Sequence, residues 1–345
     1  MPIKRVEGPV EPKKRSGGLY FASENPNIQF ISTGSALLDC VLGGGYAVGR
    51  VANIVGDKSV GKTLLAIEAC ANFARMFPKG RIVYAESEAA FDQEYAATIG
   101  LPVDRIRWQR DLQTVEDLIN DILKRLDKSN GQPSLYVLDS LDALSDDKEM
   151  EREMGEGSYG TQKAKLMSEF FRKHIHRIAE AKMTLLIISQ VRDNIGVTFG
   201  RSYKRSGGRA LDFYASHVLY LAYLSALTKT VHNHKRAIGV QIKAKCEKNK
   251  IDMPMRTCVF DLLFGYGIDD VGTNLRFLKE VNALGEVGLQ GQKLSKEIAK
   301  MAFLSEDKMR ARIEEIAVAT KRVWRKIEIE FRPTRRKYDN EAGRK

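Results

Sequence analysis

The feature that most constrains this chain is a glycine-rich segment that fits the pattern Gly-x-x-x-x-Gly-Lys-Thr, namely Gly56-Asp57-Lys58-Ser59-Val60-Gly61-Lys62-Thr63. It follows an apolar run at residues 50–55 and leads into a helix-like segment at residues 64–76. A triphosphate needs backbone N–H groups that converge on its oxygens, and glycines let the chain present them at a helix N-terminus. Strand, loop and helix together predict a phosphate-binding loop rather than an ordinary strand-to-helix turn.

The side chains of this loop have distinct expected roles. Lys62 is expected to reach the β- and γ-phosphates, and the Thr63 hydroxyl to bind Mg²⁺. The predicted cofactors are therefore ATP and Mg²⁺. The loop residues predicted to bind ATP are Gly56, Asp57, Lys58, Ser59, Val60, Gly61, Lys62, Thr63 and Leu64.

Apolar runs alternate with amphipathic segments over much of the chain. A short strand is expected at residues 28–31, further strands at 50–55, 81–85, 134–138 and 184–189, and helices at 64–76, 115–126 and 163–180. Strands that are apolar on both faces and separated by helices imply a mostly parallel central sheet with helices on both faces. Three later runs, 217–222, 236–245 and 255–262, predict an antiparallel extension. The expected fold class is α/β, of the doubly wound type.

The character of the sequence changes after about residue 270. Ser305 followed by two acidic residues predicts a helix N-cap, and apolar residues at helical spacing from Ile313 to Ile327 predict one long helix that ends before Pro333. No internal repeat is evident. The predicted organisation is a basic N-terminal arm (1–27), an ATPase core (28–270), a small helical C-terminal appendage (271–330) and a basic tail (331–345).

The charge of this 345-residue chain is uneven, because much of its net +12 lies at the two ends. Such ends commonly bind polyanions, most often nucleic acid, although solvated tails that only aid solubility are the alternative. The charged start lacks the apolar region of a signal peptide, and the most apolar stretch, 217–227, is too short to span a bilayer. We therefore expect an intracellular protein without a membrane partner. Four scattered cysteines argue against a zinc site or a disulfide framework.

Acidic residues follow two of the predicted strands. Asp139 ends the apolar run 134–138, where it can hold the hydration shell of Mg²⁺ opposite Thr63. Glu86 and Glu88 follow the run 81–85, and a carboxylate at that edge can orient the water that attacks the γ-phosphate. Both glutamates qualify on the pattern alone, and an exposed loop acid is the alternative for each.

A glycine-rich, non-periodic stretch at residues 192–209 carries five basic residues, with apolar and aromatic residues between them. Cations neutralise phosphates, whereas apolar and aromatic side chains stack on unpaired bases, which suits single strands better than duplex. The stretch therefore predicts a site for single-stranded nucleic acid.

These motifs together resemble those of the RecA-type DNA recombinases, in particular the shorter or phage-encoded members. The resemblance covers roughly residues 30–270, and its segments are 32–35, 43–45, 56–63, 88–92, 138–140, 187–192, 195–200, 207–216 and 248–251. It implies a P-loop NTPase of RecA type that hydrolyses ATP in a DNA-dependent manner. It also implies filaments on single-stranded DNA, strand exchange with homologous duplex DNA, and a place in the cytoplasm, at the nucleoid or in a phage-infected cell.

The resemblance assigns further roles in the ATP site. The catalytic glutamate falls on Glu88, because its spacing to Asp92 matches the family. Asp92 and Tyr95 match positions that contact the adenine, and Gln190 matches the residue that senses the γ-phosphate. Two lysines match residues that reach the γ-phosphate of the adjacent protomer. The implied catalytic set is Lys62, Glu88, Gln190, Lys248 and Lys250.

The resemblance also assigns the DNA contacts. The stretch 192–209 matches the second DNA loop, in which Ile195 wedges between bases, and residues 153–160 match the first. Lys165 and Arg172 match cationic positions on the helix that follows. The predicted DNA-binding set is Arg172, Arg192, Ile195, Gly196, Val197, Thr198, Phe199, Arg201, Lys204, Arg205, Gly207, Gly208 and Arg209.

The chain departs from the family at both ends. The N-terminal arm lacks a long helix, and the chain ends in basic rather than acidic residues, which leaves neighbour docking and control by the tail open. Two other functions are compatible with the core: a hexameric helicase or branch-migration motor, and a mediator that uses ATP only as a conformational ligand. The stretch after Gln190 and the later lysines favour the recombinase over the motor, and Glu88 argues against the mediator.

Overall fold

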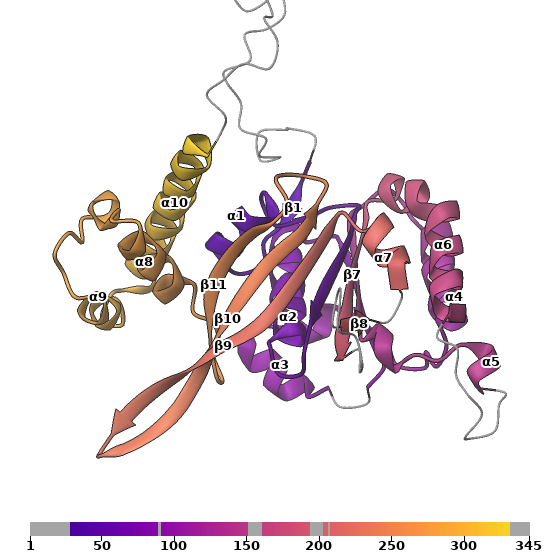
Figure 1. Ribbon diagram of the computed structural model, residues 1–345, viewed down its shortest axis with the longest axis horizontal. Coiled ribbons are helices and arrows are strands. Elements are labelled where there is room, and N and C mark those ends of the chain that lie inside the picture. Colours follow the sequence, from indigo (N-terminus) through magenta and orange to yellow (C-terminus); the bar gives the residue numbers. More distant parts are fainter. Residues whose placement is uncertain (1–27, 89–90, 151–160, 194–202, 206–207, 332–345) are drawn as a thin grey trace, which may run out of the picture.

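The computed structural model describes the backbone of residues 28–88, 91–150, 161–193, 203–205 and 208–331. In this part of the chain one large twisted sheet carries helices on both faces (Figure 1). Its strand order is β12-β11-β10-β9-β3-β7-β6-β4-β5, and a short strand, β8 (Tyr203–Arg205), pairs with β7. The predicted α/β fold class is confirmed.

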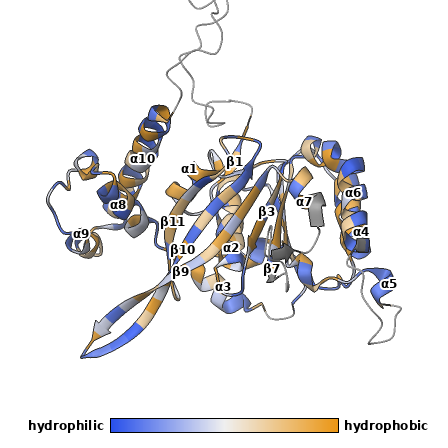
Figure 2. Cartoon of the chain, viewed as in Figure 1, coloured by the Kyte–Doolittle hydropathy of each residue, from blue (hydrophilic) through white to orange (hydrophobic). Residues whose placement is uncertain are grey.

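Five neighbouring strands form the parallel centre of the sheet. All six residues of β3 are buried, because the strand is covered on both faces, and Figure 2 shows the central strands as largely hydrophobic. Parallel strands bring their carboxyl ends to one edge, which is where ligands bind in such sheets. The five strands are β3 (Val51–Gly56), β7 (Met183–Asp193), β6 (Ser134–Asp139), β4 (Arg81–Glu86) and β5 (Ile106–Gln109).

The helices divide between the two faces through two hydrophobic clusters. On one face, side chains of α1 (Ala36–Leu42) and α2 (Lys62–Met76) pack on the sheet, with α3 (Gln93–Ile99) beside them. On the other face, α4 (Val115–Asp127) and α6 (Thr161–Glu180) pack on it. Of two short helices, α5 (Asp147–Met150) precedes the first predicted DNA segment, and α7 (Gly208–Tyr214) begins at the end of the second.

The antiparallel extension is longer than predicted. β9 (His217–Val231) pairs in parallel with β3 and antiparallel with β10 (His234–Asn249), and β11 (Arg256–Leu263) and β12 (Gly267–Ile268) follow. The outer part of the β9–β10 hairpin projects beyond the sheet (Figure 1). The side chains of this outer part are mostly exposed. The apolar pattern in the sequence therefore stops at the edge of the core, whereas the two strands continue beyond it. The predicted run at residues 28–31 forms only the two-residue strand β1 (Phe30–Ile31), paired with β2 (Tyr46–Ala47).

Three helices follow the last strand: α8 (Asp270–Glu280), α9 (Leu294–Met301) and α10 (Glu306–Glu330). They enclose a hydrophobic cluster of their own. The long helix begins after Ser305 as expected, but the Ser305 side chain makes no capping hydrogen bond, so the acidic first turn remains as the helix-start signal.

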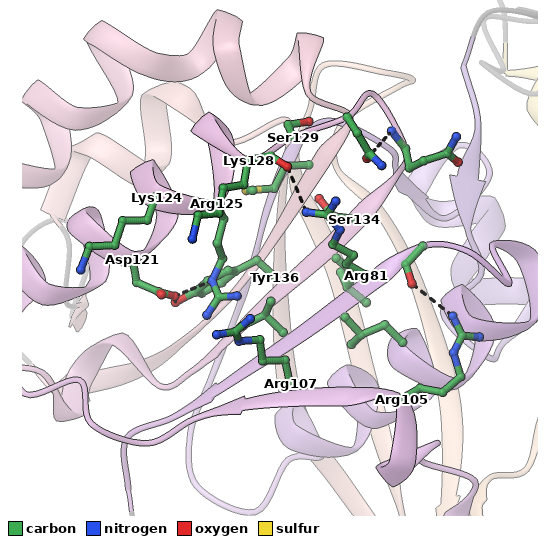
Figure 3. Close-up of a pocket in the computed structure, with 17 residues that line it drawn as sticks. Arg81, Arg105, Arg107, Asp121, Lys124, Arg125, Lys128, Ser129, Ser134 and Tyr136 are labelled. Atoms are coloured by element: carbon green, nitrogen blue, oxygen red, sulfur yellow. Dashed lines mark hydrogen bonds and ion pairs between the residues drawn. The ribbon is translucent and has the colours of Figure 1, made fainter.

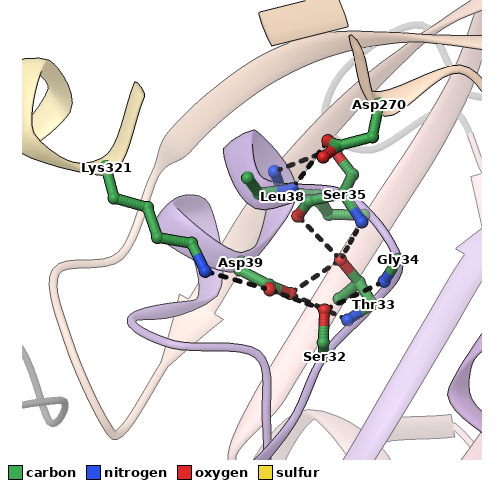
Figure 4. Close-up of polar contacts among 9 residues, drawn as sticks. Ser32, Thr33, Gly34, Ser35, Leu38, Asp39, Asp270 and Lys321 are labelled. Atoms are coloured by element: carbon green, nitrogen blue, oxygen red, sulfur yellow. Dashed lines mark hydrogen bonds and ion pairs between the residues drawn. The ribbon is translucent and has the colours of Figure 1, made fainter. Parts of the chain in front are cut away.

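A buried polar network joins these helices to the core (Figure 4). Asp39 accepts hydrogen bonds from the N–H and the hydroxyl of Thr33, both at 2.8 Å, and lies 4.0 Å from Nζ of Lys321 on α10. Asp270, at the start of α8, accepts a bond of 2.8 Å from the N–H of Ala36 on α1. Burial raises the pKa of both carboxyls, and that of Asp270 rises to about 6. Two desolvated acids therefore help to hold the C-terminal helices against the core.

All four cysteines are free thiols. Within the described residues, no helix is both long enough and apolar enough to cross a membrane.

Candidate nucleotide site

The phosphate loop joins the carboxyl end of β3 to α2, as the sequence predicted. Gly61 caps α2 with φ of 82°, and a Cβ atom there would lie 2.3 Å from Cδ1 of Leu262, so only glycine fits. Nζ of Lys62 donates a hydrogen bond of 2.6 Å to the carbonyl oxygen of Asp57. Burial lowers the pKa of Lys62, and nearby carboxylates, Asp139 first, oppose that shift. The lysine is thus held inside the loop, beside the space that a phosphate requires.

Asp139 lies at the end of β6 and faces the same loop. Its Oδ2 accepts hydrogen bonds from the hydroxyls of Thr63 and Tyr84, each at 2.8 Å. Burial raises the pKa of Asp139, while these two bonds lower it. A hydroxyl and a carboxylate, with no nitrogen or sulfur, form an oxygen donor set that suits Mg²⁺. Tyr84 was missed by sequence reasoning because a tyrosine inside an apolar strand carries no distinguishing signal.

The described residues contain no group of three or more His, Cys, Asp or Glu side chains arranged to hold a metal ion. Mg²⁺ is usually held by one or two carboxylates together with substrate phosphates and water, so a site with few protein ligands fits it.

The two glutamates after β4 have different environments. Oε1 of Glu88 accepts a hydrogen bond of 2.6 Å from the Ser140 hydroxyl and one of 3.1 Å from Nε2 of Gln190. Glu86 is only 7% exposed, and its Oε1 accepts the N–H of Glu88 at 3.1 Å. The exposed Glu88 is therefore the better placed of the two to meet a water molecule at the sheet edge. Ser140 was not predicted, although it directly follows Asp139.

Gln190 lies on β7 where the strand leaves the sheet edge. Its N–H donates to Oδ2 of Asp142 at 2.6 Å while its side chain contacts Glu88. Beyond it, β7 pairs antiparallel with β8, and Arg192 is the register partner of Lys204. Strand β7 thus contacts Glu88 through Gln190, leads into the predicted nucleic-acid stretch, and pairs with β8 near the end of that stretch.

The structure locates only part of the predicted DNA-binding set. Arg172 and Lys165 lie on exposed positions of α6. Arg192 and Lys204 belong to strands β7 and β8, as does Arg205, whereas Gly208 and Arg209 belong to α7. Lying outside the described residues are segment 153–160 and Ile195, Gly196, Val197, Thr198, Phe199, Arg201 and Gly207.

The predicted adenine contacts lie at the start of α3. Asp92 is the N-cap of this helix, and its side chain accepts the N–H of Tyr95 at 2.9 Å. Tyr95 is 47% exposed, and its hydroxyl oxygen accepts a hydrogen bond of 3.5 Å from the backbone nitrogen of Gly265, in the turn between β11 and β12. An exposed ring leaves a face on which a base can stack.

Within a single protomer, Lys248 and Lys250 lie away from the phosphate loop, at the carboxyl end of α7. Lys248 belongs to β10 rather than following it, and it donates to the carbonyl oxygens of Asp212 and, at 2.6 Å, Phe213. Lys250 donates to the Phe213 carbonyl at 3.0 Å and lies 5.8 Å from the centre of the Phe213 ring. Both lysines therefore stabilise the carboxyl end of α7. The structure does not bring them to the phosphate loop of their own chain.

Comparison with known proteins agrees with this geometry. The family described as the RecA N-terminal domain matches residues 17–269. Protein RecA of Prochlorococcus marinus (strain MIT 9211) is 36% identical over 261 residues, which cover 76% of this chain and 68% of that protein. Protein RecA of Synechococcus sp. (strain CC9902) is also 36% identical over 261 residues, with 76% and 67% covered. The chain therefore belongs to the RecA family.

Proposed function

We propose that this protein is a DNA-dependent ATPase that forms helical filaments on single-stranded DNA and catalyses homologous pairing and strand exchange with duplex DNA. The observation that carries the proposal is the hydrogen bond between Gln190 and Glu88. It links the acid that faces the nucleotide site to the strand that continues into the predicted DNA-binding stretch. A simple ATP-binding module needs no such link.

In the proposed mechanism, the N–H groups of the phosphate loop and the ammonium group of Lys62 bind the phosphates of ATP. Thr63 and Asp139 would hold Mg²⁺, which when bound neutralises charge on the phosphate oxygens. Glu88 orients the attacking water and accepts its proton, and Ser140 positions the Glu88 carboxylate through its 2.6 Å hydrogen bond.

Gln190 couples the two sites in this proposal. Its amide group donates to Glu88 in the structure, and a γ-phosphate would compete for that donor because phosphate oxygens are strong acceptors. A change of partner would move the end of β7, and β8 would follow because the two strands are hydrogen-bonded. Binding of ATP would therefore alter how the stretch after Gln190 meets DNA.

The neighbouring protomer completes the site in this proposal. Lys248 and Lys250 would leave the carbonyls of α7 and reach the γ-phosphate bound by the next protomer. A head-to-tail contact of this kind builds an open helical filament unless its rotation closes a ring. The relatives named above are RecA proteins, and the comparisons do not favour the helicase or branch-migration motor.

The deciding experiment measures ATP hydrolysis, filament formation and joint-molecule formation in one preparation. We expect single-stranded DNA to stimulate hydrolysis, electron microscopy to show extended filaments, and joint molecules to form only with homologous duplex. The Lys62→Ala protein should lose all three, because it lacks the charge that binds the phosphates. Unwinding of non-homologous duplex by closed rings would instead identify a motor. DNA annealing without ATP turnover would identify a mediator.

A further inference from the structure

A cavity of about 370 Å³ lies at the opposite end of the strands that carry the nucleotide site. It opens at the amino ends of β4 and β6, whose carboxyl ends carry Glu86 and Asp139. Figure 3 shows its lining side chains coming from α4, from β4 and from the edge strand β5. The cavity is thus distinct from the phosphate loop and from the predicted DNA-binding stretch.

The lining is strongly basic. It contains six cationic side chains and one carboxylate, that of Asp121, which gives a net charge of +5. Basic residues at the carboxyl end of α4 are ordinary, because they complement the helix dipole, but that explanation covers only Lys124, Arg125 and the C-cap residue Lys128. The three remaining arginines come from other segments and line the same cavity. The six are Arg81, Arg105, Arg107, Lys124, Arg125 and Lys128.

Three of these cations are fixed by the protein itself. Arg105 donates to four carbonyl oxygens around the end of α2, the shortest bond being 2.7 Å to Ala74. Arg81 donates to the carbonyl oxygen of Lys128 at 3.1 Å, and Arg125 donates to Asp121 at 2.7 Å. These hydrogen bonds restrict the three side chains and keep their charges near the cavity wall, which lowers the entropic cost of binding an anion.

The other three cations remain available to a ligand. Within the described part of the chain, no carboxylate lies within 4.0 Å of the charged groups of Arg107, Lys124 or Lys128. Arg107 is an exposed residue on the edge strand, and both lysines are exposed on or just after α4. Like charges gathered without counter-ions repel one another, and a multiply charged anion would remove that repulsion.

The inner wall of the cavity has a different chemistry. Ile82, Val83, Leu135 and Met183 line it, and each is at most 5% exposed. A small-molecule site typically combines such an apolar wall with a few convergent polar groups, and this volume lies within the usual range for such sites. A DNA backbone instead follows an extended positive track along a surface.

We propose that this cavity binds a small organic phosphate of nucleotide size. Arg107, Lys124 and Lys128 contact its phosphate groups, the fixed arginines contribute the surrounding positive potential, and the apolar wall contacts the uncharged part. The site is separate from the ATP site, so it acts whether or not the phosphate loop is occupied.

The test uses full-length protein with Lys62→Ala, which weakens phosphate binding at the loop. Isothermal titration calorimetry with ADP measures the remaining site, and adenosine serves as the probe without phosphate. In this background we compare Arg107→Gln/Lys128→Gln with Lys296→Gln/Lys300→Gln, which removes the same charge from exposed positions of α9. We expect ADP to bind, adenosine not to bind, and only the cavity variant to lose affinity, by about tenfold or more.

Several outcomes would overturn the proposal. These are the absence of ADP binding, adenosine binding as tightly as ADP, and an equal loss of affinity in both double variants. A cavity variant that binds ADP normally but binds duplex DNA more weakly would show that these cations contact a DNA backbone instead. Thermal melting of each variant, together with ATP hydrolysis by the cavity variant with Lys62 restored, verifies that the fold is intact.

Discussion

Nε2 of Gln190 lies 3.1 Å from Oε1 of Glu88, although 102 positions separate the two residues in the chain. The contact exists because β7 and β4 lie on either side of β6 and end at the same edge of the sheet. It places a carboxylate suited to water activation next to an amide suited to phosphate binding.

Glu88→Gln should separate binding from chemistry. The substitution keeps the shape of the side chain but removes the carboxylate, so ATP should still bind while hydrolysis falls by roughly 10²-fold or more. Filaments should therefore persist longer. Steady-state ATPase assays and nucleotide titration of the same protein measure both quantities. Glu86→Gln is the matched control, and if it gives this pattern while Glu88→Gln does not, the catalytic position is wrong by two residues.

Gln190→Ala should uncouple the ATP and DNA sites. The variant lacks the amide group that contacts Glu88, but it retains the backbone N–H that donates to Asp142, so β7 should keep its place. We expect ATP binding to remain and stimulation of hydrolysis by single-stranded DNA to be largely lost. The measured quantity is the ratio of hydrolysis rates with and without DNA. A ratio equal to that of the wild type would contradict a coupling role.

The sequence predicts features that arise from neighbouring residues, but not contacts between segments that are far apart in the chain. The phosphate loop was predictable because strand, glycines and helix are consecutive, and each leaves a local pattern. The bond from Tyr84 to Asp139 was not predictable, because it depends on the register between β4 and β6, in which Glu86 is opposite Asp139. A register between distant strands leaves no mark in either segment alone.

The outer part of the β9–β10 hairpin was also not predictable from the sequence. Its outer strands have exposed side chains, so the hydrophobic pattern that indicates a strand is missing there. The turn at His232 and Asn233 has φ values of 47° and 64°, as hairpin turns of two residues require, but without the glycine that usually signals such a turn. At the opposite end, β10 continues to Asn249, past the predicted end at residue 245, so Lys248 lies within the strand.

Asp270→Asn should change how stability depends on pH. Burial, aided by Asp39, raises the pKa of Asp270 to about 6 from 3.8, whereas the N–H of Ala36 lowers it. The folded state then holds the proton more tightly than the unfolded state, so the contribution of Asp270 to stability falls as the pH rises from about 4 to about 6. The asparagine oxygen can still accept the bond from Ala36 but does not ionise.

The measurement is urea unfolding of both proteins across this pH range. Between about pH 4 and about pH 7, the unfolding free energy of Asp270→Asn should rise relative to that of the wild type by up to about 3 kcal/mol. If the difference in unfolding free energy between the two proteins does not change with pH, ionisation of Asp270 does not destabilise the folded state.

The last prediction concerns the two lysines that the structure places at the carboxyl end of α7. If Lys248 and Lys250 act on the nucleotide of the adjacent protomer, a defect in them and a defect in Lys62 belong to different partners of one shared site. Mixing Lys62→Ala protein with Lys248→Ala/Lys250→Ala protein would then create some interfaces with an intact loop and intact lysines, about a quarter of them if assembly is random. DNA-dependent ATP hydrolysis should partly return, although each variant alone is nearly inactive.

The structure supplies a matched control for this experiment. Lys62 and Glu88 face the same site of the same protomer, because the Glu88 carboxylate is among the groups that act on the pKa of Lys62. A mixture of Lys62→Ala and Glu88→Gln proteins should therefore remain inactive, since every site lacks one of the two residues. Recovery in both mixtures would point to contamination with wild-type protein rather than to a shared site. No recovery in the lysine mixture, despite verified co-assembly, would leave Lys248 and Lys250 with the role that their contacts show within one protomer, which is to hold the end of α7.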